Sequence, residues 1–321
     1  MDKYTHVIAY LYGTPWAVMP EKLTAILNFI DQKAEGMTFT KDELEGRFGA
    51  LARPSARTQG SIAVIPVIGT IGQRMNMMSE FSGGTSVEKL TKQILSAADD
   101  PKVKAIVLDI DSPGGTVGGV PELSKVIFEA RQKKHIIAQS NSLMASAAYW
   151  IGSAADEVVV TPSGEVGSIG VFTAHYDVSA SHEMAGVKTT LISAGKFKVE
   201  GNPFEPLAAD ARDAIQSDVD KFYEMFVADV ARNRGTGVNQ VRNGFGQGRT
   251  VTAKDALKEG MVDRIATLDE TLARLGATGV EFKDKRVELF EHDQQLSLAE
   301  HGKDRVFDSQ TERKKLELLT I

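Results

Sequence analysis

The chain has 321 residues and a formal net charge of −6, with 42% hydrophobic and 25% charged residues. This composition is typical of a globular protein, so it excludes wholesale disorder, and the acidic balance argues against a dominant nucleic-acid-binding surface. The chain contains no cysteine, which excludes disulfides, thiol catalysis and cysteine-ligated metal sites.

Metal-binding and membrane signals are also missing from the sequence. The six histidines show no ligand spacing such as HExxH, so we expect neither a metal nor another cofactor. No apolar run approaches the roughly 20 residues that a membrane-spanning helix needs. The first residues lack a basic segment followed by an apolar core, the pattern of a signal peptide. We therefore expect a soluble, intracellular protein.

Residues 1–57 are expected to form an N-terminal extension of the main domain. Within it, the sequence predicts an amphipathic helix over residues 21–33. The apolar residues that recur there at helical spacing are Leu23, Ile26, Leu27 and Ile30. Such a helix either packs on the main body of its own chain or contacts a neighbouring subunit or partner.

Residues 58–275 are expected to form the main domain, because short apolar runs alternate there with amphipathic segments. The predicted strands are 61–71, 103–112, 135–140, 156–162, 168–179 and 187–198. The predicted helices are 87–100, 120–134, 206–235 and a helix that begins near Ser146. This alternation predicts an α/β fold with much parallel sheet. Residues 276–321 are charge-mixed and are expected to form a mobile tail or a helical arm.

The first candidate functional feature is the run Asp-Ser-Pro-Gly-Gly from Asp111 to Gly115, directly after a predicted buried strand. Proline fixes φ, and two glycines let the backbone turn sharply and expose N–H groups. Exposed N–H groups at such a turn can bind an oxyanion. The same composition also suits an ordinary turn between a strand and a helix.

The second feature is the segment MASAAYW, which contains Ser146 and follows a predicted strand. A serine at a strand-to-helix turn holds its hydroxyl near helix N–H groups, which suits a nucleophile. The alternative is a serine that caps the helix, followed by small residues that pack tightly.

The third feature is the GKFK segment, which places Lys196 and Lys198 at the end of a predicted strand. A lysine there is usually a solvated charge. A lysine buried beside a serine would instead be neutral more readily and could accept the serine proton. Both lysines face the same side of an extended strand, so their spacing does not choose between them.

In this order, DSPGG, MASAAYW, GEVGSIGVF and SAGKFK resemble the signal peptide peptidase A family of serine proteases (peptidase family S49). That family has the Clp-protease/crotonase fold, so the resemblance implies repeated ββα units with parallel sheets over roughly residues 60–270. It implies that Ser146 is the nucleophile, Lys198 the general base and Ser168 the residue that positions the lysine amine. The residues that match the oxyanion hole are Gly114, Gly115 and Ala147. Such a Ser-Lys site needs neither histidine nor aspartate.

The N-terminal block LYGTPWAVMPEKL is similar to the start of the tailed-phage or prophage branch of this family. Members of that branch are head-maturation proteases, which cut scaffold and portal proteins during capsid assembly. The resemblance implies a protein or peptide substrate bound in extended form, and a homo-oligomer in the shape of a ring or dome. It also implies action in the bacterial host cytoplasm or inside a procapsid, with no cofactor and no nucleic-acid partner.

Four alternatives remain open from the sequence. A Ser-His-Asp site would use His175, which lies 29 residues after Ser146. A crotonase-like enzyme would use the oxyanion turn on a thioester and would need neither Ser146 nor Lys198. A cytoplasmic peptidase that degrades signal peptides would share the chemistry but not the phage role. A structural or scaffold-binding protein of the same fold would have no reason to retain Ser146, Ser168 and Lys198.

Overall fold

The computed structural model describes residues 14–34, 36–40, 43, 55–74 and 84–277. The chain divides into two units, residues 1–277 and residues 278–321. The expectation of a tail or helical arm after residue 276 falls almost wholly outside the described residues.

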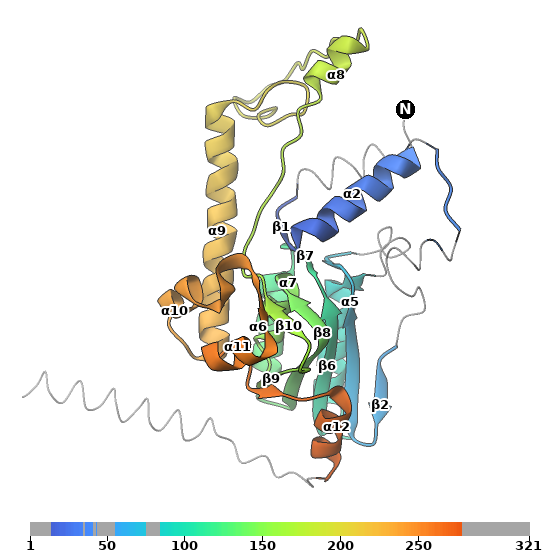
Figure 1. Ribbon diagram of the computed structural model, residues 1–321, viewed down its shortest axis with the longest axis vertical. Helices are drawn as coiled ribbons and strands as arrows, with labels where there is room; N and C mark the ends of the chain where they lie inside the picture. The colour runs from blue at the N-terminus through green and yellow to red at the C-terminus, as the bar shows by residue number, and fades with distance from the viewer. Residues whose placement is uncertain (1–13, 35, 41–42, 44–54, 75–83, 278–321) are drawn as a thin grey trace, which may run out of the picture. The chain divides into compact units, whose positions relative to one another are not determined.

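The larger of two sheets has a parallel core, in which β6 and β8 lie at the centre (Figure 1). β3 pairs in parallel with β6, while β9 and β10 pair in parallel with the first and last parts of β8. The strands of this sheet are β2 (Arg57–Gln59), β3 (Ile62–Ile68), β6 (Ala105–Ser112), β8 (His135–Ala145), β9 (Glu157–Val160), β10 (Glu165–Gly167), β11 (Thr250–Thr252) and β12 (Arg264–Ile265).

The smaller sheet has four short strands in the order β1-β7-β4-β5. They are β1 (Trp16–Val18), β4 (Ile71–Gly72), β5 (Thr85–Ser86) and β7 (Gly114–Thr116). β7 follows β6 after a single intervening residue, Pro113, so the two sheets meet at the carboxyl end of β6.

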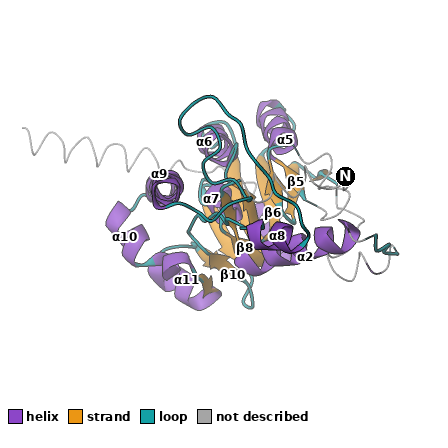
Figure 2. Ribbon diagram, turned by 90° about the horizontal axis from the view of Figure 1, so that it is seen from above, coloured by secondary structure: helices purple, strands orange, loops and turns teal. Residues whose placement is uncertain are grey.

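Helices cover both faces of the larger sheet. Figure 2 shows α5 and α6 side by side on one face, where their apolar side chains join the main core. α12 covers the other face through Leu272 and Leu275. The helices are α2 (Pro20–Ala34), α5 (Val87–Asp99), α6 (Val120–Ala130), α7 (Ala147–Gly152), α8 (Ser179–Met184), α9 (Ala209–Arg234), α10 (Val238–Asn243), the 3-10 helix η1 (Phe245–Gly248), α11 (Ala253–Glu259) and α12 (Leu268–Ala277).

The α/β architecture with parallel strands is therefore confirmed, and units of two strands and a helix recur as β4-β5-α5 and β6-β7-α6. β6 is buried on both faces, as its continuous run of valine, isoleucine and leucine predicts. In α5, Val87, Leu90, Ile94 and Ala98 are buried at helical spacing, and Ser86 caps the helix by accepting a hydrogen bond from the Lys89 N–H.

Two predicted strands are wrong. In the predicted strand 168–179, only Phe172 pairs, through an isolated bridge to Trp16. Residues 187–198 form loop and turn, and their side chains are exposed. A strand needs a neighbouring strand for its N–H and C=O groups, and apart from Phe172 the residues of these two segments pair with no sheet edge. β8 also runs to Ala145, five residues past its predicted end, and β10 was not predicted.

The predicted N-terminal helix is confirmed as α2. Its apolar residues are buried against Trp16 and Val18 of β1, with Phe172 packed alongside. The helix therefore packs on its own chain. No helix in the described part of the chain has the length and apolar composition needed to cross a bilayer.

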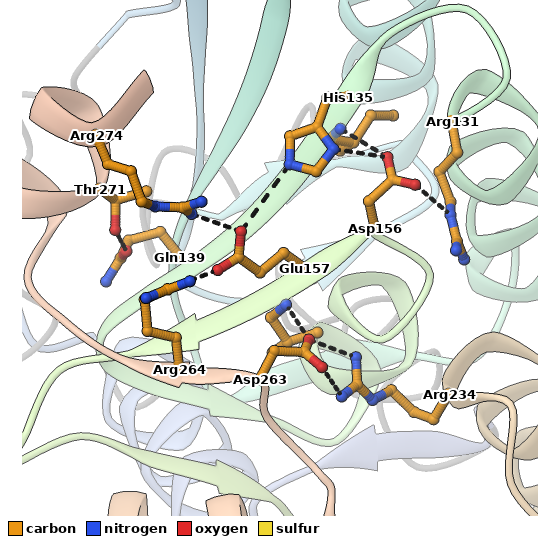
Figure 3. Close-up of polar contacts among 12 residues, drawn as sticks. Arg131, His135, Gln139, Asp156, Glu157, Arg234, Asp263, Arg264, Thr271 and Arg274 are labelled. Carbon is orange, nitrogen blue, oxygen red and sulfur yellow. Dashed lines mark hydrogen bonds and ion pairs between the residues drawn. The ribbon is translucent and has the colours of Figure 1, made fainter. Parts of the chain in front are cut away.

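A network of charged side chains joins the amino ends of β8 and β9 (Figure 3). Glu157 lies at its centre and accepts hydrogen bonds from Arg264, at 2.9 Å, and from Arg274. His135 Nε2 lies 3.9 Å from the same carboxylate. Burial alone would raise the pKa of Glu157, but the neighbouring His135 and the hydrogen bonds from Arg264 and Arg274 outweigh burial and lower the pKa to about 2. The ionised carboxylate therefore stabilises the fold.

We expect the substitution Glu157→Gln to lower the free energy of unfolding by on the order of 2 kcal/mol at pH 7. The folded-state pKa lies below the ordinary value of 4.5, so the stabilisation is present above pH 4.5 and is lost as pH falls towards about 2. Urea unfolding at pH 7 and pH 3 measures this, with Glu165→Gln on β10 as the control. An equal loss of stability at both pH values would contradict the electrostatic explanation.

Candidate active site

Ser146 lies at the sharp turn where β8 ends and α7 begins. Its backbone has φ 55° and ψ −120°, a conformation that residues other than glycine rarely adopt. The Ser146 N–H donates to the Gly167 carbonyl at 2.7 Å, and the Ser146 carbonyl accepts from the Trp150 N–H at 2.9 Å. A strained serine between a strand and a helix is the arrangement that exposes a nucleophilic hydroxyl in α/β-hydrolases.

The helix after Ser146 is wholly buried and held from two sides. Trp150 stacks on Phe226 of α9 with ring centroids 4.3 Å apart, and its indole N–H donates to Asp229 at 2.8 Å. The Tyr149 hydroxyl donates to the Met261 carbonyl at 2.9 Å. Small residues fill the remaining positions because space is short: a β-carbon on Gly152 would lie 2.2 Å from the sulfur of Met144. Tight packing therefore keeps Ser146 in place.

The glycine turn after β6 lies against Ser146. Gly114 has φ +99°, and a β-carbon there would lie 2.9 Å from the β-carbon of Ser146 and 3.0 Å from the Ala145 carbonyl oxygen. Glycine is therefore required at position 114, both for its backbone conformation and for its close approach to the serine. The structure brings together the first and second features found in the sequence.

The backbone amides of this turn already have partners within the chain. The Gly114 N–H donates to the Ser112 hydroxyl at 3.2 Å, and that hydroxyl donates to the Gly69 carbonyl at 2.7 Å. Gly115 lies opposite Ala17 in the ladder between β7 and β1. Ala147 is the first residue of α7, directly after the serine. Of the three expected oxyanion-hole residues, Gly114 therefore packs against Ser146 and Ala147 directly follows it, whereas Gly115 pairs with β1.

Ser168 lies at the same edge of the sheet as Ser146. It follows β10, whose Gly167 pairs with Ala145 of β8, so the two serines come directly after neighbouring parallel strands. Ser168 also has a positive φ of 53°, and its N–H donates to the Arg249 carbonyl at 2.8 Å. The Ser146 hydroxyl is 3.5 Å from the Gly170 carbonyl, so residues after β10 contact the serine.

Lys198 is not brought to Ser146 within this chain. It lies in an exposed turn of the segment 173–208, which we call the arm. The arm carries α8 and joins α9 at the end of that helix remote from the sheet (Figure 1). Lys196, in the same turn, places its amine 4.7 Å from the centre of the Phe197 ring.

His175 is also engaged in the arm. Its Nε2 lies 3.1 Å from the Asn202 carbonyl, so this nitrogen carries the proton and donates it. No hydrogen bond joins His175 to Ser146 among the described residues. The geometry therefore offers no support for a Ser-His-Asp site.

Two carboxylates precede the glycine turn on β6. Burial raises the pKa of Asp109, although Arg57 and a hydrogen bond from Asn141 act against it. Burial also raises the pKa of Asp111, against a backbone hydrogen bond from Leu143. The bonds to residues of β8 tie the end of β6 to the strand that carries Ser146.

Sequence reasoning missed two parts of this site. One is Ser112, whose hydroxyl links the Gly114 amide to Gly69. The other is β1, which runs beside Gly114–Thr116. A strand of three residues is too short to show the alternation of apolar and polar residues that predicts a strand. The apolar run at residues 16–18 was therefore the only signal for β1.

Comparison with known proteins identifies the family. The model of peptidase family S49 matches residues 129–281. The chain is 34% identical over 218 residues to the capsid assembly protease C of Escherichia phage lambda, which covers 68% of this chain and 49% of that protein. It is 33% identical over 284 residues to the head-tail preconnector protein GP5 of Enterobacteria phage P21, which covers 84% of this chain and 56% of that protein. The chain thus spans about half the length of these two relatives.

Among solved structures, a ClpP1 mutant from Listeria monocytogenes aligns with 65% of this chain and 94% of its own, with 16% identity and a TM-score of 0.41. The matched family segment contains Ser146, Ser168 and Lys198, and it confirms the family predicted from the four sequence motifs. Residues 129–281 of this chain belong to peptidase family S49.

Proposed function

We propose that this chain is a serine endopeptidase in which Ser146 is the nucleophile and Lys198 the general base. The observation that carries the proposal is the strained turn at Ser146, packed against the backbone of Gly114. Strain at a buried serine persists only where the surroundings hold it, and it is concentrated at functional sites. The match to peptidase family S49 supports hydrolysis of peptide bonds as the reaction.

In the proposed mechanism, a neutral lysine amine accepts the Ser146 proton and the serine oxygen attacks a peptide carbonyl. Backbone N–H groups of Gly114, Gly115 and Ala147 would stabilise the negative charge that forms on the carbonyl oxygen, once the Gly114 N–H is released from the Ser112 hydroxyl and Gly115 from β1. The lysine then returns its proton to the leaving amine, and water hydrolyses the acyl-enzyme. Ser168 would position the lysine amine from the neighbouring strand end.

The lysine reaches the serine, in our proposal, from the arm of a second copy of the chain. Lys198 lies on an arm whose apolar side chains are exposed, including Ile192 at 96% and Met184 at 85%. Exposed apolar surface of this kind favours contact with another protein surface. A ring or dome of copies would bury the arms and complete each site.

The substrate we propose is an extended segment of a phage or prophage head protein, such as a scaffold or portal protein. Two relatives of this chain are named for capsid assembly and for the head-tail connection. The protease would then act in the bacterial host cytoplasm or inside a procapsid, during head maturation.

We expect Ser146→Ala to reduce hydrolysis of a flexible protein by at least about 1,000-fold, because the nucleophile is removed. Ser142→Ala is the matched control, since Ser142 is an exposed serine on β8, four residues before Ser146. Cleavage of casein followed by gel electrophoresis measures both variants. Full activity in the folded Ser146→Ala protein would refute the assignment.

We also expect activity to return when inactive Ser146→Ala and Lys198→Ala proteins are mixed. Random exchange of copies would give roughly a quarter of the sites one intact serine and one intact lysine from different chains. The single variant Lys196→Ala should retain activity, and this result would distinguish Lys198 from Lys196 as the general base. No recovery after exchange has been verified by mass measurement would place both residues in one chain.

A further inference from the structure

A strand from the N-terminal region runs directly beside the proposed nucleophile. β1 lies antiparallel to β7, with Val18 opposite Gly114 and Ala17 opposite Gly115. Hydrogen bonds extend this pairing at both ends. The Met19 N–H donates to the Pro113 carbonyl at 3.0 Å, and the Val117 N–H donates to the Pro15 carbonyl at 3.2 Å.

The other edge of β1 is also paired. The Trp16 N–H donates to the Phe172 carbonyl at 2.8 Å, and the Phe172 N–H donates to the Trp16 carbonyl at 3.0 Å. Phe172 follows Ser168 by four residues, so β1 lies between the glycine turn and the segment after Ser168. An extended peptide recognised through its backbone binds in this way, as a strand added to a free sheet edge.

The carbonyl of Ala17 comes close to the serine. A β-carbon on Gly114 would lie 2.2 Å from the Ala17 oxygen and 2.9 Å from the Ser146 β-carbon. The Ala17 oxygen and the Ser146 β-carbon therefore both lie close to Gly114. A substrate strand that follows β7 towards Ser146 would have to occupy the space that β1 fills.

A cavity lies beyond the amino end of β1, in line with the space that β1 fills. Pro15 borders a cavity of about 560 Å³, which residues 171–175 line on one side and α9 on another. Along β1 itself there is no free space, because Trp16 and Ala17 are fully buried. The space next to Ser146 is thus filled by β1, and the open cavity lies beyond Pro15, further from Ser146.

We propose that residues 15–19 are a built-in occupant of the peptide-binding groove, which a substrate strand must displace to reach Ser146. The proposal rests on the proposed peptidase function and adds a mode of control to it. Substrate then binds only to the fraction of molecules in which β1 has left the groove, and its apparent affinity falls by that fraction. The substrate residue that takes the place of Ala17 in the groove is expected to have a small side chain, because Ala17 is fully buried opposite Gly115.

The first test weakens β1 without removing a large side chain. Ala17→Pro takes away the N–H at the centre of β1 and leaves α2 unchanged. Its control is Thr58→Pro, at the centre of β2, another three-residue strand that pairs antiparallel at the outer edge of the larger sheet. With oxidised insulin B chain as substrate, we expect Ala17→Pro to raise kcat/KM about tenfold, mainly through a lower KM, and the control to leave it unchanged.

A wild-type protein that cleaves the B chain as fast as a folded Ala17→Pro variant would overturn the proposal and leave the peptidase function standing. No cleavage by either protein, under conditions where copies assemble, would refute the peptidase function and the proposal with it. Circular dichroism and thermal unfolding establish whether the variants are folded.

The second measurement does not depend on catalysis or on Ala17→Pro. The chain has two tryptophans, so Trp150→Phe leaves Trp16 of β1 as the sole tryptophan, and Ser146→Ala prevents cleavage. Insulin B chain contains no tryptophan. We expect its binding, followed by the anisotropy of a labelled sample, to move Trp16 emission to longer wavelength as the side chain enters water. Binding without that shift would overturn the proposal.

Discussion

The conformation of Ser146 is the constraint around which the described structure is arranged. A positive φ at a serine costs of order 1–3 kcal/mol, and tight packing on several sides offsets that cost. The Gly167 carbonyl holds the serine N–H, Gly114 comes close because it has no side chain, and Trp150 fixes the helix behind it. Each of these contacts comes from a different part of the chain, so the turn forms only when the whole fold does.

The amino and carboxyl ends of the parallel strands carry different kinds of polar groups. At the amino ends of β8 and β9, arginines and a histidine surround Glu157 and stabilise the sheet (Figure 3). At the carboxyl ends, the groups bonded at Ser146 and at the glycine turn are a serine hydroxyl, a backbone N–H and backbone carbonyls. In a parallel sheet all strand ends of one kind lie at one edge, so stability and chemistry are separated by the length of a strand.

Under the two proposals, two features would keep the site inactive in a single chain. The arm holds Lys198 away from the sheet, and β1 fills the groove beside the serine. An endopeptidase with an open groove and a complete site would cut any flexible segment that it met. A requirement for a second copy, together with a strand that must be displaced, would restrict cleavage to assembled particles. This restriction would suit the role in head maturation that we propose above.

The sequence by itself determined the α/β class, the buried strands, α2, α5, α6 and α9, and the family, because these depend on local periodicity and on motifs with fixed spacing. It also predicted that Ser146, Gly114 and Ser168 belong to one site, and the fold brings these residues to one edge of the sheet. It failed for residues 168–179 and 187–198, whose apolar residues imitate strands that have no partner. Only the tertiary structure decided that Lys198 lies on an exposed arm and that β1 pairs beside Ser146. The first depends on the lack of a neighbouring strand for residues 187–198, and the second on backbone hydrogen bonds between distant segments, neither of which leaves a period in the sequence.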